Sequence, residues 1–270
     1  MKIVFLGGGN MASALIGGLL TRGFQPTDLA VIEKLPEARD ALAQRYGVRV
    51  FDAVNPELRE AQTIVLAVKP QDLRLALAPW SGQLSHQLVI SIAAGITLNT
   101  LSRWLGGYNR LVRAMPNTPA LIGAGAAGLF AASDVSAEER QRAEAILGAV
   151  GITAWVNEET LIDAVTALSG SGPAYVFYFI EAIEQAGRQL GLTAAVARAL
   201  AIQTFVGASQ LAAASDESPA RLRERVTSKG GTTEAALNVF AEQAIAAQIA
   251  QGLQAANARG AALGKLLDKD

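Results

Sequence analysis

Residues 7–12, with the sequence GGGNMA, constrain the fold more than any other part of this chain. They follow the apolar run IVFL at positions 3–6 and precede an apolar stretch with helical spacing. A strand, a tight glycine turn and a helix in this order open a doubly wound parallel sheet and hold the pyrophosphate of a dinucleotide. Gly7 permits the turn, Gly9 lets the backbone approach phosphate oxygens, and Ala12 lets the helix pack on the strand. An ordinary strand–helix turn is the alternative.

Composition limits the class of protein. The chain has 270 residues, 51% apolar and 17% charged, which suits one large domain or two ordinary ones with a sizeable core. A net charge of −1 provides no electrostatic attraction for nucleic acid or an anionic membrane. The absence of cysteine excludes disulfides, thiolate metal sites and a cysteine nucleophile, and no metal is expected. The chain starts directly in a strand pattern and has no apolar run of about 20 residues, so we expect a cytoplasmic protein.

The first 157 residues alternate short apolar strands with helical segments, which predicts an α/β fold with a mostly parallel sheet covered on both faces. The expected strands are residues 2–6, 29–32, 63–68, 88–92, 110–115, 125–130 and 153–156. Helices are expected over residues 12–21, 36–45, 72–77 and 98–105, and another begins after Ser136, whose N-cap is completed by Glu139 at the third helical position.

From residue 158 to residue 270 the sequence predicts helices only, over 161–190, 194–214 and 233–267, so we place a domain boundary near residue 157. Residues 176–180, VFYFI, are apolar without interruption. A helix that is apolar all round must be enclosed, and about 110 residues enclose it poorly. A partner subunit is therefore expected; burial within the same chain is the alternative.

Two charged residues follow the second expected strand, where the adenosine ribose of a dinucleotide would lie. A carboxylate at Glu33 would accept hydrogen bonds from both ribose hydroxyls and repel a 2′-phosphate, which favours NAD. Lys34 would instead pair with a 2′-phosphate. A solvated charge pair is the third interpretation.

Other strands end at the same predicted edge, where ligands of open α/β sheets bind. Lys69 follows one of them, either as a ligand contact or as a solvated lysine beside Pro70, which suits a first helical turn. Small residues at 91–95 leave room for a ring. Prolines at 116 and 119 fix a turn that would aim Asn117, whose side chain both donates and accepts.

Two further segments lie in the helical part. Residues 169–175, SGSGPAY, permit close approach of a backbone or a ring, although a helix crossing would use them equally well. Residues 227–233, TSKGGTT, precede a helix, and backbone N–H groups there form an anion nest that suits a carboxylate. An N-cap by Thr232 or Thr233 is the second interpretation and is compatible with the first.

Together these segments resemble the pyrroline-5-carboxylate reductases. The resemblance rests on residues 7–12, 68–70, 115–119, 169–175 and 227–233, in this order, and runs over nearly the full chain. It implies reduction of 1-pyrroline-5-carboxylate to L-proline with NADPH or NADH, the last step of proline biosynthesis. It also implies an N-terminal Rossmann domain and an all-α C-terminal domain that intertwines with a second subunit, with dimers often assembling to decamers.

The resemblance assigns residues to each ligand. The cofactor would contact Gly7, Gly9, Asn10, Met11, Glu33, Lys34, Asn55, Ala67, Val68, Lys69, Pro70, Ala93, Ala94 and Asn117. The substrate would contact Glu159, Ser171, Gly230, Gly231, Thr232 and Thr233, with Thr233 and Lys69 as the catalytic residues. The Thr233 hydroxyl would bond the ring nitrogen, and backbone N–H groups would hold the carboxylate.

Two positions depart from the family pattern. Lys229 stands where the family most often has proline, which affects the rigidity of the loop. Glu33 stands where NADP-preferring members have a small polar residue, so the cofactor preference stays open.

The expected reaction is hydride transfer from nicotinamide C4 to the imine carbon. His86, the one histidine, lies in a polar loop and is expected to be solvated, so the motifs offer no clear general acid. Positioning and electrostatics should carry catalysis, and the substrate is protonated before binding or through water.

Two rival functions remain. A related β-hydroxyacid or imine reductase would rely on a lysine in the helical part, but residues 158–222 contain none. A non-catalytic NAD(P)-binding regulator fits the first half alone, and it needs no carboxylate nest.

Overall fold

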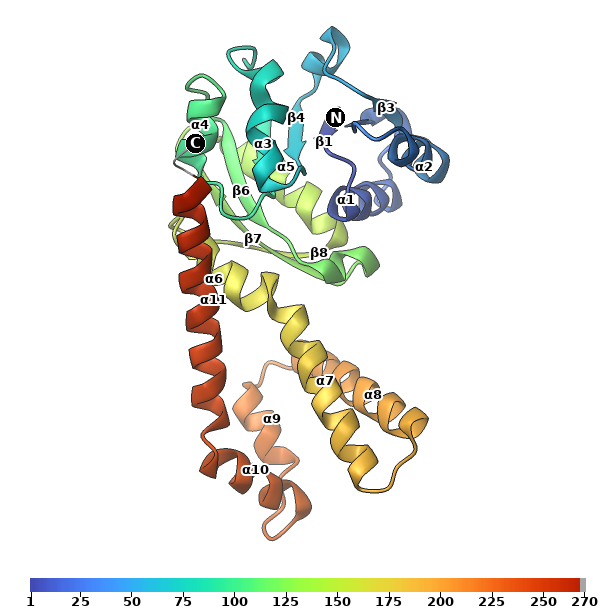
Figure 1. The fold of residues 1–270 in the computed structure, drawn as a ribbon, viewed down its shortest axis with the longest axis vertical. Coiled ribbons are helices and arrows are strands. Elements are labelled where there is room, and N and C mark those ends of the chain that lie inside the picture. The colour runs from blue at the N-terminus through green and yellow to red at the C-terminus, as the bar shows by residue number, and fades with distance from the viewer. Residues whose placement is uncertain (268–270) are drawn as a thin grey trace. The chain divides into compact units, whose positions relative to one another are not determined.

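The structure, a computed structural model, describes residues 1–267, and the side chains through residue 266. The chain forms two compact units (Figure 1). One contains residues 1–171 together with the described residues from Ala255 onward, and the other contains residues 172–254.

The first unit is built on one eight-stranded sheet, in the order β3-β2-β1-β4-β5-β6-β7-β8. The strands are β1 Ile3–Leu6, β2 Leu29–Ile32, β3 Arg49–Phe51, β4 Thr63–Leu66, β5 Leu88–Ser91, β6 Leu111–Met115, β7 Gly125–Ala131 and β8 Gly151–Trp155. All neighbours are parallel except β6 and β7. The doubly wound sheet expected from the sequence is confirmed.

Alternation along each strand divides the core into two layers. Ile3 and Phe5 pack with α1 Asn10–Thr21, α2 Pro36–Tyr46 and α5 Ala137–Leu147 on one face. Val4 and Leu6 pack with α3 Pro70–Leu77 and α4 Leu98–Trp104 on the other. Short 3-10 helices join these elements: η1 Pro26–Asp28, η2 Pro56–Glu60, η3 Ala78–Trp80, η4 Thr118–Ile122 and η5 Gly148–Val150.

Helix α6 Leu161–Val165 continues into a π-helix, η6 Thr166–Gly170, which ends the first unit. The second unit contains α7 Gly172–Gln189, α8 Ala194–Ala213, α9 Pro219–Arg225 and α10 Thr232–Glu242. Helix α11 Ile245–Leu267 starts in this unit and ends in the first. Within the described part of α7 to α10, Ala197 and Ala201 are the only buried apolar residues, which leaves apolar side chains such as Phe177 exposed.

Several predicted elements differ from the structure. Strand β3 was not expected, because its three half-buried residues give no alternation to detect. The expected helix 161–190 is interrupted at η6, where the Ser171 N–H donates to the Thr166 carbonyl five residues back. The expected helix 233–267 is broken at Ala244, whose positive φ of 52° no helical spacing reveals. Helix α9 was missed because Arg and Glu dominate it.

Candidate functional site

The carboxyl ends of the parallel strands meet at one edge of the sheet. Leu6 pairs in register with both Ile32 and Leu66, and Leu66 pairs with Ser91. The residues that follow these four positions therefore share the edge. The strand order reverses between β1 and β4, and open α/β sheets bind ligands at such a switch point.

The glycine loop lies at this switch point. Gly7 has φ of 99° and its N–H donates to the Ile32 carbonyl at 2.8 Å. A Cβ on Gly7 would lie 2.8 Å from the carbonyl oxygen of Ala67, so no other residue fits there. Gly9 is the N-cap of α1 without a side-chain cap, and a Cβ on it would meet nothing within 4 Å. The cradle thus fits a dinucleotide pyrophosphate beside the first N–H groups of α1, those of Asn10 and Met11 among them.

Glu33 is fixed at the end of β2 by two backbone donors. Gly8 N–H donates to its Oε2 at 2.9 Å, and Leu35 N–H donates to its Oε1 at 3.0 Å. Arg39 covers the back of this turn, because its guanidinium donates to the carbonyl oxygens of Glu33 and Lys34, each at 2.8 Å. The carboxylate is therefore oriented against the glycine loop.

A cavity of about 480 Å³ adjoins Glu33, at the place where the sequence predicts the adenosine ribose. Its lining includes Gly7 and Val68 together with three carboxylates, Glu33, Asp52 and Asp72. Lys34 is the basic residue among the lining residues. The excess of negative charge disfavours a phosphate at this end of the cavity.

The other predicted cofactor residues have different surroundings. Lys69 is exposed and is the N-cap of α3, with Pro70 as the first helical residue. Ala93 is buried and Ala94 is exposed after β5. Asn55 caps η2, since its Oδ1 accepts from the Leu58 N–H at 3.1 Å.

Asn117 ties three chain segments together. Its Oδ1 accepts from the Ala126 N–H of β7 at 2.8 Å, and its Nδ2 donates to the Ser169 carbonyl of η6 at 3.0 Å. Its side chain thus forms two hydrogen bonds within the protein, although the sequence led us to expect a contact with the cofactor. One Nδ2 proton is not used by these bonds.

Glu159 takes part in a partly buried ion cluster around Arg113. Its Oε1 accepts from the Leu98 N–H at 2.7 Å and from Arg113 Nη1 at 3.2 Å. Arg113 is 3% exposed and also pairs with Asp163 through Nη2, at 3.3 Å. Sequence reasoning missed Arg113 and Asp163. The available signal was one arginine inside LVRAM, an otherwise apolar strand.

The predicted substrate loop lies in the second unit. Gly230 has φ of 71° and its N–H donates to the Glu234 carboxylate at 2.6 Å. The N-cap of α10 is Gly231, without a side-chain bond, so the interpretation of Thr232 or Thr233 as the N-cap is wrong. The first N–H groups of α10 have no acceptor within the helix, as an anion site requires.

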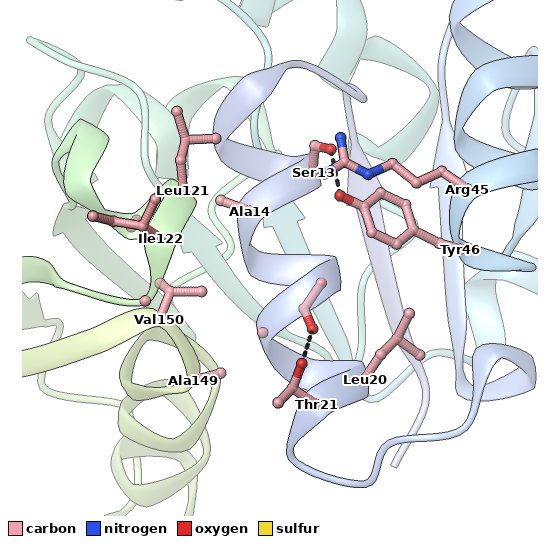
Figure 2. Close-up of a pocket in the computed structure, with 14 residues that line it drawn as sticks. Ser13, Ala14, Leu20, Thr21, Arg45, Tyr46, Leu121, Ile122, Ala149 and Val150 are labelled. Carbon is pink, nitrogen blue, oxygen red and sulfur yellow. Dashed lines mark hydrogen bonds between the residues drawn. The ribbon is translucent and has the colours of Figure 1, made fainter.

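A second cavity, of about 560 Å³, follows the flank of α1 away from its N-terminus (Figure 2). Figure 2 shows the Ser13 and Tyr46 hydroxyls facing each other, 2.9 Å apart, on one side of α1, with Leu121 and Ile122 on the other. None of the predicted ligand residues lines this cavity.

His86 lies in the loop before β5, and its Nδ1 is 3.1 Å from the Ser85 hydroxyl. That position is at the amino end of the strand, opposite the edge where Gly7 and Glu33 lie. The fold thus separates the one histidine from the cofactor cradle.

Comparisons with known proteins agree over nearly the whole chain. A family model described as pyrroline-5-carboxylate reductase dimerisation matches residues 159–263, and one described as NADP oxidoreductase coenzyme F420-dependent matches residues 2–95. A pyrroline-5-carboxylate reductase from Pseudomonas aeruginosa is 44% identical over 98% of each chain.

Two solved structures are also similar. A pyrroline-5-carboxylate reductase from Coxiella burnetii has a TM-score of 0.93 at 39% identity, covering 97% of this chain and 98% of that one. A pyrroline carboxylate reductase from Plasmodium falciparum with NADP bound has a TM-score of 0.85 at 29% identity, covering 98% of both chains.

Proposed function

Because the chain belongs to the pyrroline-5-carboxylate reductase family, which reduces 1-pyrroline-5-carboxylate to L-proline, we propose that the residues described above bind NAD(P)H and this cyclic imine. The chain is an oxidoreductase of proline biosynthesis that acts on a CH–NH bond with NAD(P)H.

The observation that supports the cofactor site is the contact between Gly7 and Ala67 at the switch point of the sheet. The pyrophosphate is assigned to the loop of Gly7 and Gly9 with the N–H groups of Asn10 and Met11. The adenosine end is assigned to Glu33, Lys34 and Asn55. The nicotinamide end is assigned to Ala67, Val68, Lys69, Pro70, Ala93, Ala94 and Asn117.

The substrate is assigned to the loop before α10. The N–H groups of Thr232 and Thr233 at the start of α10 hold its carboxylate, and the Thr233 hydroxyl accepts from the protonated ring nitrogen. Gly230 and Gly231 shape the loop, because their own N–H groups donate to Glu234 and to the Ser228 carbonyl. Bound nicotinamide supplies the hydride that reaches the imine carbon. A protonated iminium accepts hydride more readily than a neutral imine, so a Thr233 hydrogen bond that favours the protonated form increases the fraction of substrate able to react.

Ser171 and Glu159 complete the assigned substrate residues, and Lys69 is assigned as a second catalytic residue. Glu159 has one oxygen already bonded to Arg113 and Leu98, so its proposed part is to orient the segment that carries Ser171.

The match to a dimerisation family supports self-association. We assign residues 1–157 to dinucleotide binding and residues 158–270 to dimerisation and substrate binding, in an intertwined dimer that assembles further, up to a decamer. In residues 1–267 no helix is both long and apolar enough to cross a bilayer. A cytoplasmic location is part of the proposal.

The test is the steady-state oxidation of NADH and NADPH with 1-pyrroline-5-carboxylate. Wild type should turn over. Thr233→Ala should lose kcat/KM by an amount equivalent to roughly 1–3 kcal/mol, because one hydrogen bond to a charged group is removed. Thr233→Ser keeps the hydroxyl and should retain most of the rate. Full activity of Thr233→Ala would refute the role of the hydroxyl, and no turnover by wild type would favour the regulator or another imine reductase.

A further inference from the structure

Strand β6 contacts the segment 159–171 at two points. The first is the buried guanidinium of Arg113, whose two terminal nitrogens pair with Glu159 at 3.2 Å and Asp163 at 3.3 Å. These carboxylates are four residues apart, the spacing that places two side chains on one face of a helix. The planar guanidinium of Arg113 therefore fixes both the residues just before α6 and the first turn of that helix.

The second point lies four residues further along the chain. Asn117 lies two residues after the end of β6 and donates to the Ser169 carbonyl of η6 at 3.0 Å. Its amide oxygen accepts from Ala126 on β7, so the side chain is held on a rigid strand. Between the two points, Met115 lies beneath Gly170, where a Cβ would be 3.5 Å from its Cγ.

The π-helix η6 follows the first point of attachment and contains the second, at Ser169. Its turn is closed by the Ser171 N–H, which donates to the Thr166 carbonyl at 2.8 Å. π-turns are rare and are frequently found at functional sites. Arg113 pairs in register with Ser91, and Ser91 pairs with Leu66. Arg113 therefore lies in the last row of paired strand residues before the sheet edge that is assigned to the cofactor.

We propose that Arg113, with Asp163 and Asn117, is a positioning device that holds η6 as a π-turn and so fixes Ser171 for the substrate. Arg113 touches neither Ser171 nor the cofactor loop, and it pairs with Glu159 at the start of the segment, so it acts on Ser171 through the segment 159–171. This inference rests on the proposed function only in giving Ser171 a substrate role.

The chemistry of the cluster supports positioning over stability. A buried ion pair is costly to desolvate, and apolar residues of similar volume commonly stabilise a protein as well or better. What a guanidinium adds is geometry, because its two nitrogens hold two carboxylates at fixed directions. The Leu98 N–H contributes a third donor to the two carboxylates and joins the start of α4 to the same cluster.

The test uses Asp163→Asn and Arg113→Lys, with Arg110→Lys as the matched control. Arg110 pairs with Glu139 at 3.5 Å at the other end of β6, so its loss leaves η6 unaffected. Amide hydrogen exchange is measured without substrate, and KM for 1-pyrroline-5-carboxylate and the Kd for NADH are measured separately.

In Asp163→Asn we expect exchange of amides 166–171 to speed up by about tenfold and KM for the imine to rise by about fivefold, because each lost contact frees the turn. The Kd for NADH should stay within about twofold, since the glycine loop is held by other bonds. Arg113→Lys should act in the same direction. If it does not fold, Asp163→Asn decides alone, because its side chain is 20% exposed and its replacement is nearly isosteric.

If amides 166–171 exchange in Asp163→Asn at the wild-type rate, the proposal that the Arg113 cluster holds η6 is refuted. Faster exchange with an unchanged KM for the imine would overturn its role in positioning. The exchange result does not need turnover, so a wild type that fails to reduce the imine would refute the proposed function and leave the structural part of the inference to be judged by exchange.

Discussion

The Glu33 carboxylate accepts a hydrogen bond from the backbone N–H of Gly8, and this bond joins the end of β2 to the glycine loop. The same carboxylate also accepts from Leu35, so both of its oxygens have a backbone donor. One side chain thereby fixes the loop assigned to the pyrophosphate and the surface assigned to the ribose. Cofactor choice and loop geometry are coupled at this residue.

Replacing Glu33 should shift the cofactor preference toward NADPH. Glu33→Gln keeps an acceptor for Gly8 and removes the negative charge, whereas Glu33→Ser also removes the acceptor. Since a 2′-phosphate carries about −1.5 to −2 charges, we expect the ratio of kcat/KM for NADPH to that for NADH to rise by about tenfold in both variants. Steady-state kinetics with both cofactors measures this ratio.

Asp28→Asn is the control for charge, because Asp28 precedes β2 and lies at the opposite edge of the sheet. It should leave the ratio unchanged. An equal ratio in wild type and Glu33→Gln would remove Glu33 from the ribose site.

Gly7→Ala should abolish cofactor binding, and Gly23→Ala is its matched control. Both glycines have positive φ, 99° and 95°, so both variants carry backbone strain of about 1–3 kcal/mol. A Cβ on Gly7 meets the Ala67 carbonyl at 2.8 Å, whereas a Cβ on Gly23 meets nothing within 4 Å. Thermal unfolding should show a loss of stability in both variants, and NADH titration a loss of binding only in Gly7→Ala. Equal NADH affinities in the two variants would contradict the cradle.

The strands of the first unit were predictable from the sequence where an apolar run marks each of them. IVFL before GGG, and apolar runs at regular intervals, indicate strands that are buried on both faces and are therefore mostly apolar. Strand β3 was not predictable, because RVF owes its place to pairing with β2. The break at Ala244 and the π-turn at η6 depend on tertiary contacts that no periodicity encodes.

The site was predictable in its position and less so in its contacts. A glycine is required where the backbone passes close to a carbonyl group, as Gly7 does, and the spacing of the glycine motif identifies this position in the sequence. Asn117 and Glu159 carry polar groups near the same edge, but their partners are the Ser169 carbonyl and Arg113, which are 46 to 52 residues away in the chain. Long-range hydrogen bonds of this kind leave no local pattern.

Tyr108 should make stability depend on alkaline pH. Burial raises the pKa of Tyr108 from 10.0 to about 12, with Arg110 lowering it and Glu139 raising it. Between these values the unfolded chain loses the proton while the folded chain retains it, so the stabilising contribution is complete below pH 10 and falls as pH rises toward 12.

Denaturant unfolding of wild type and Tyr108→Phe, at several pH values between 8 and 11.5, measures this contribution. The variant loses the hydrogen bond to the Gln87 carbonyl, so it should be less stable at pH 8 by about 0.5–1.5 kcal/mol. The difference should shrink as pH rises above 10. A difference that stays constant to pH 11.5 would show that the hydroxyl does not titrate as its burial requires.

Glu234 should both shape the substrate loop and oppose the charge of the substrate. Its carboxylate accepts from the Gly230 N–H at 2.6 Å, within the nest assigned to the carboxylate of the imine. Glu234→Gln keeps an acceptor and removes the repulsion, so KM for 1-pyrroline-5-carboxylate should fall by about twofold to fivefold. Glu234→Ala also removes the acceptor, which frees the loop, and its KM should exceed that of the Gln variant by about threefold to tenfold. Glu242→Gln, at the other end of α10, should leave KM unchanged, because Glu242 lies about 12 Å from Glu234 along the helix axis. Equal KM values for the Gln and Ala variants would show that the Gly230 hydrogen bond does not organise the nest, and a KM in Glu234→Gln above that of wild type would show that the charge does not oppose the substrate.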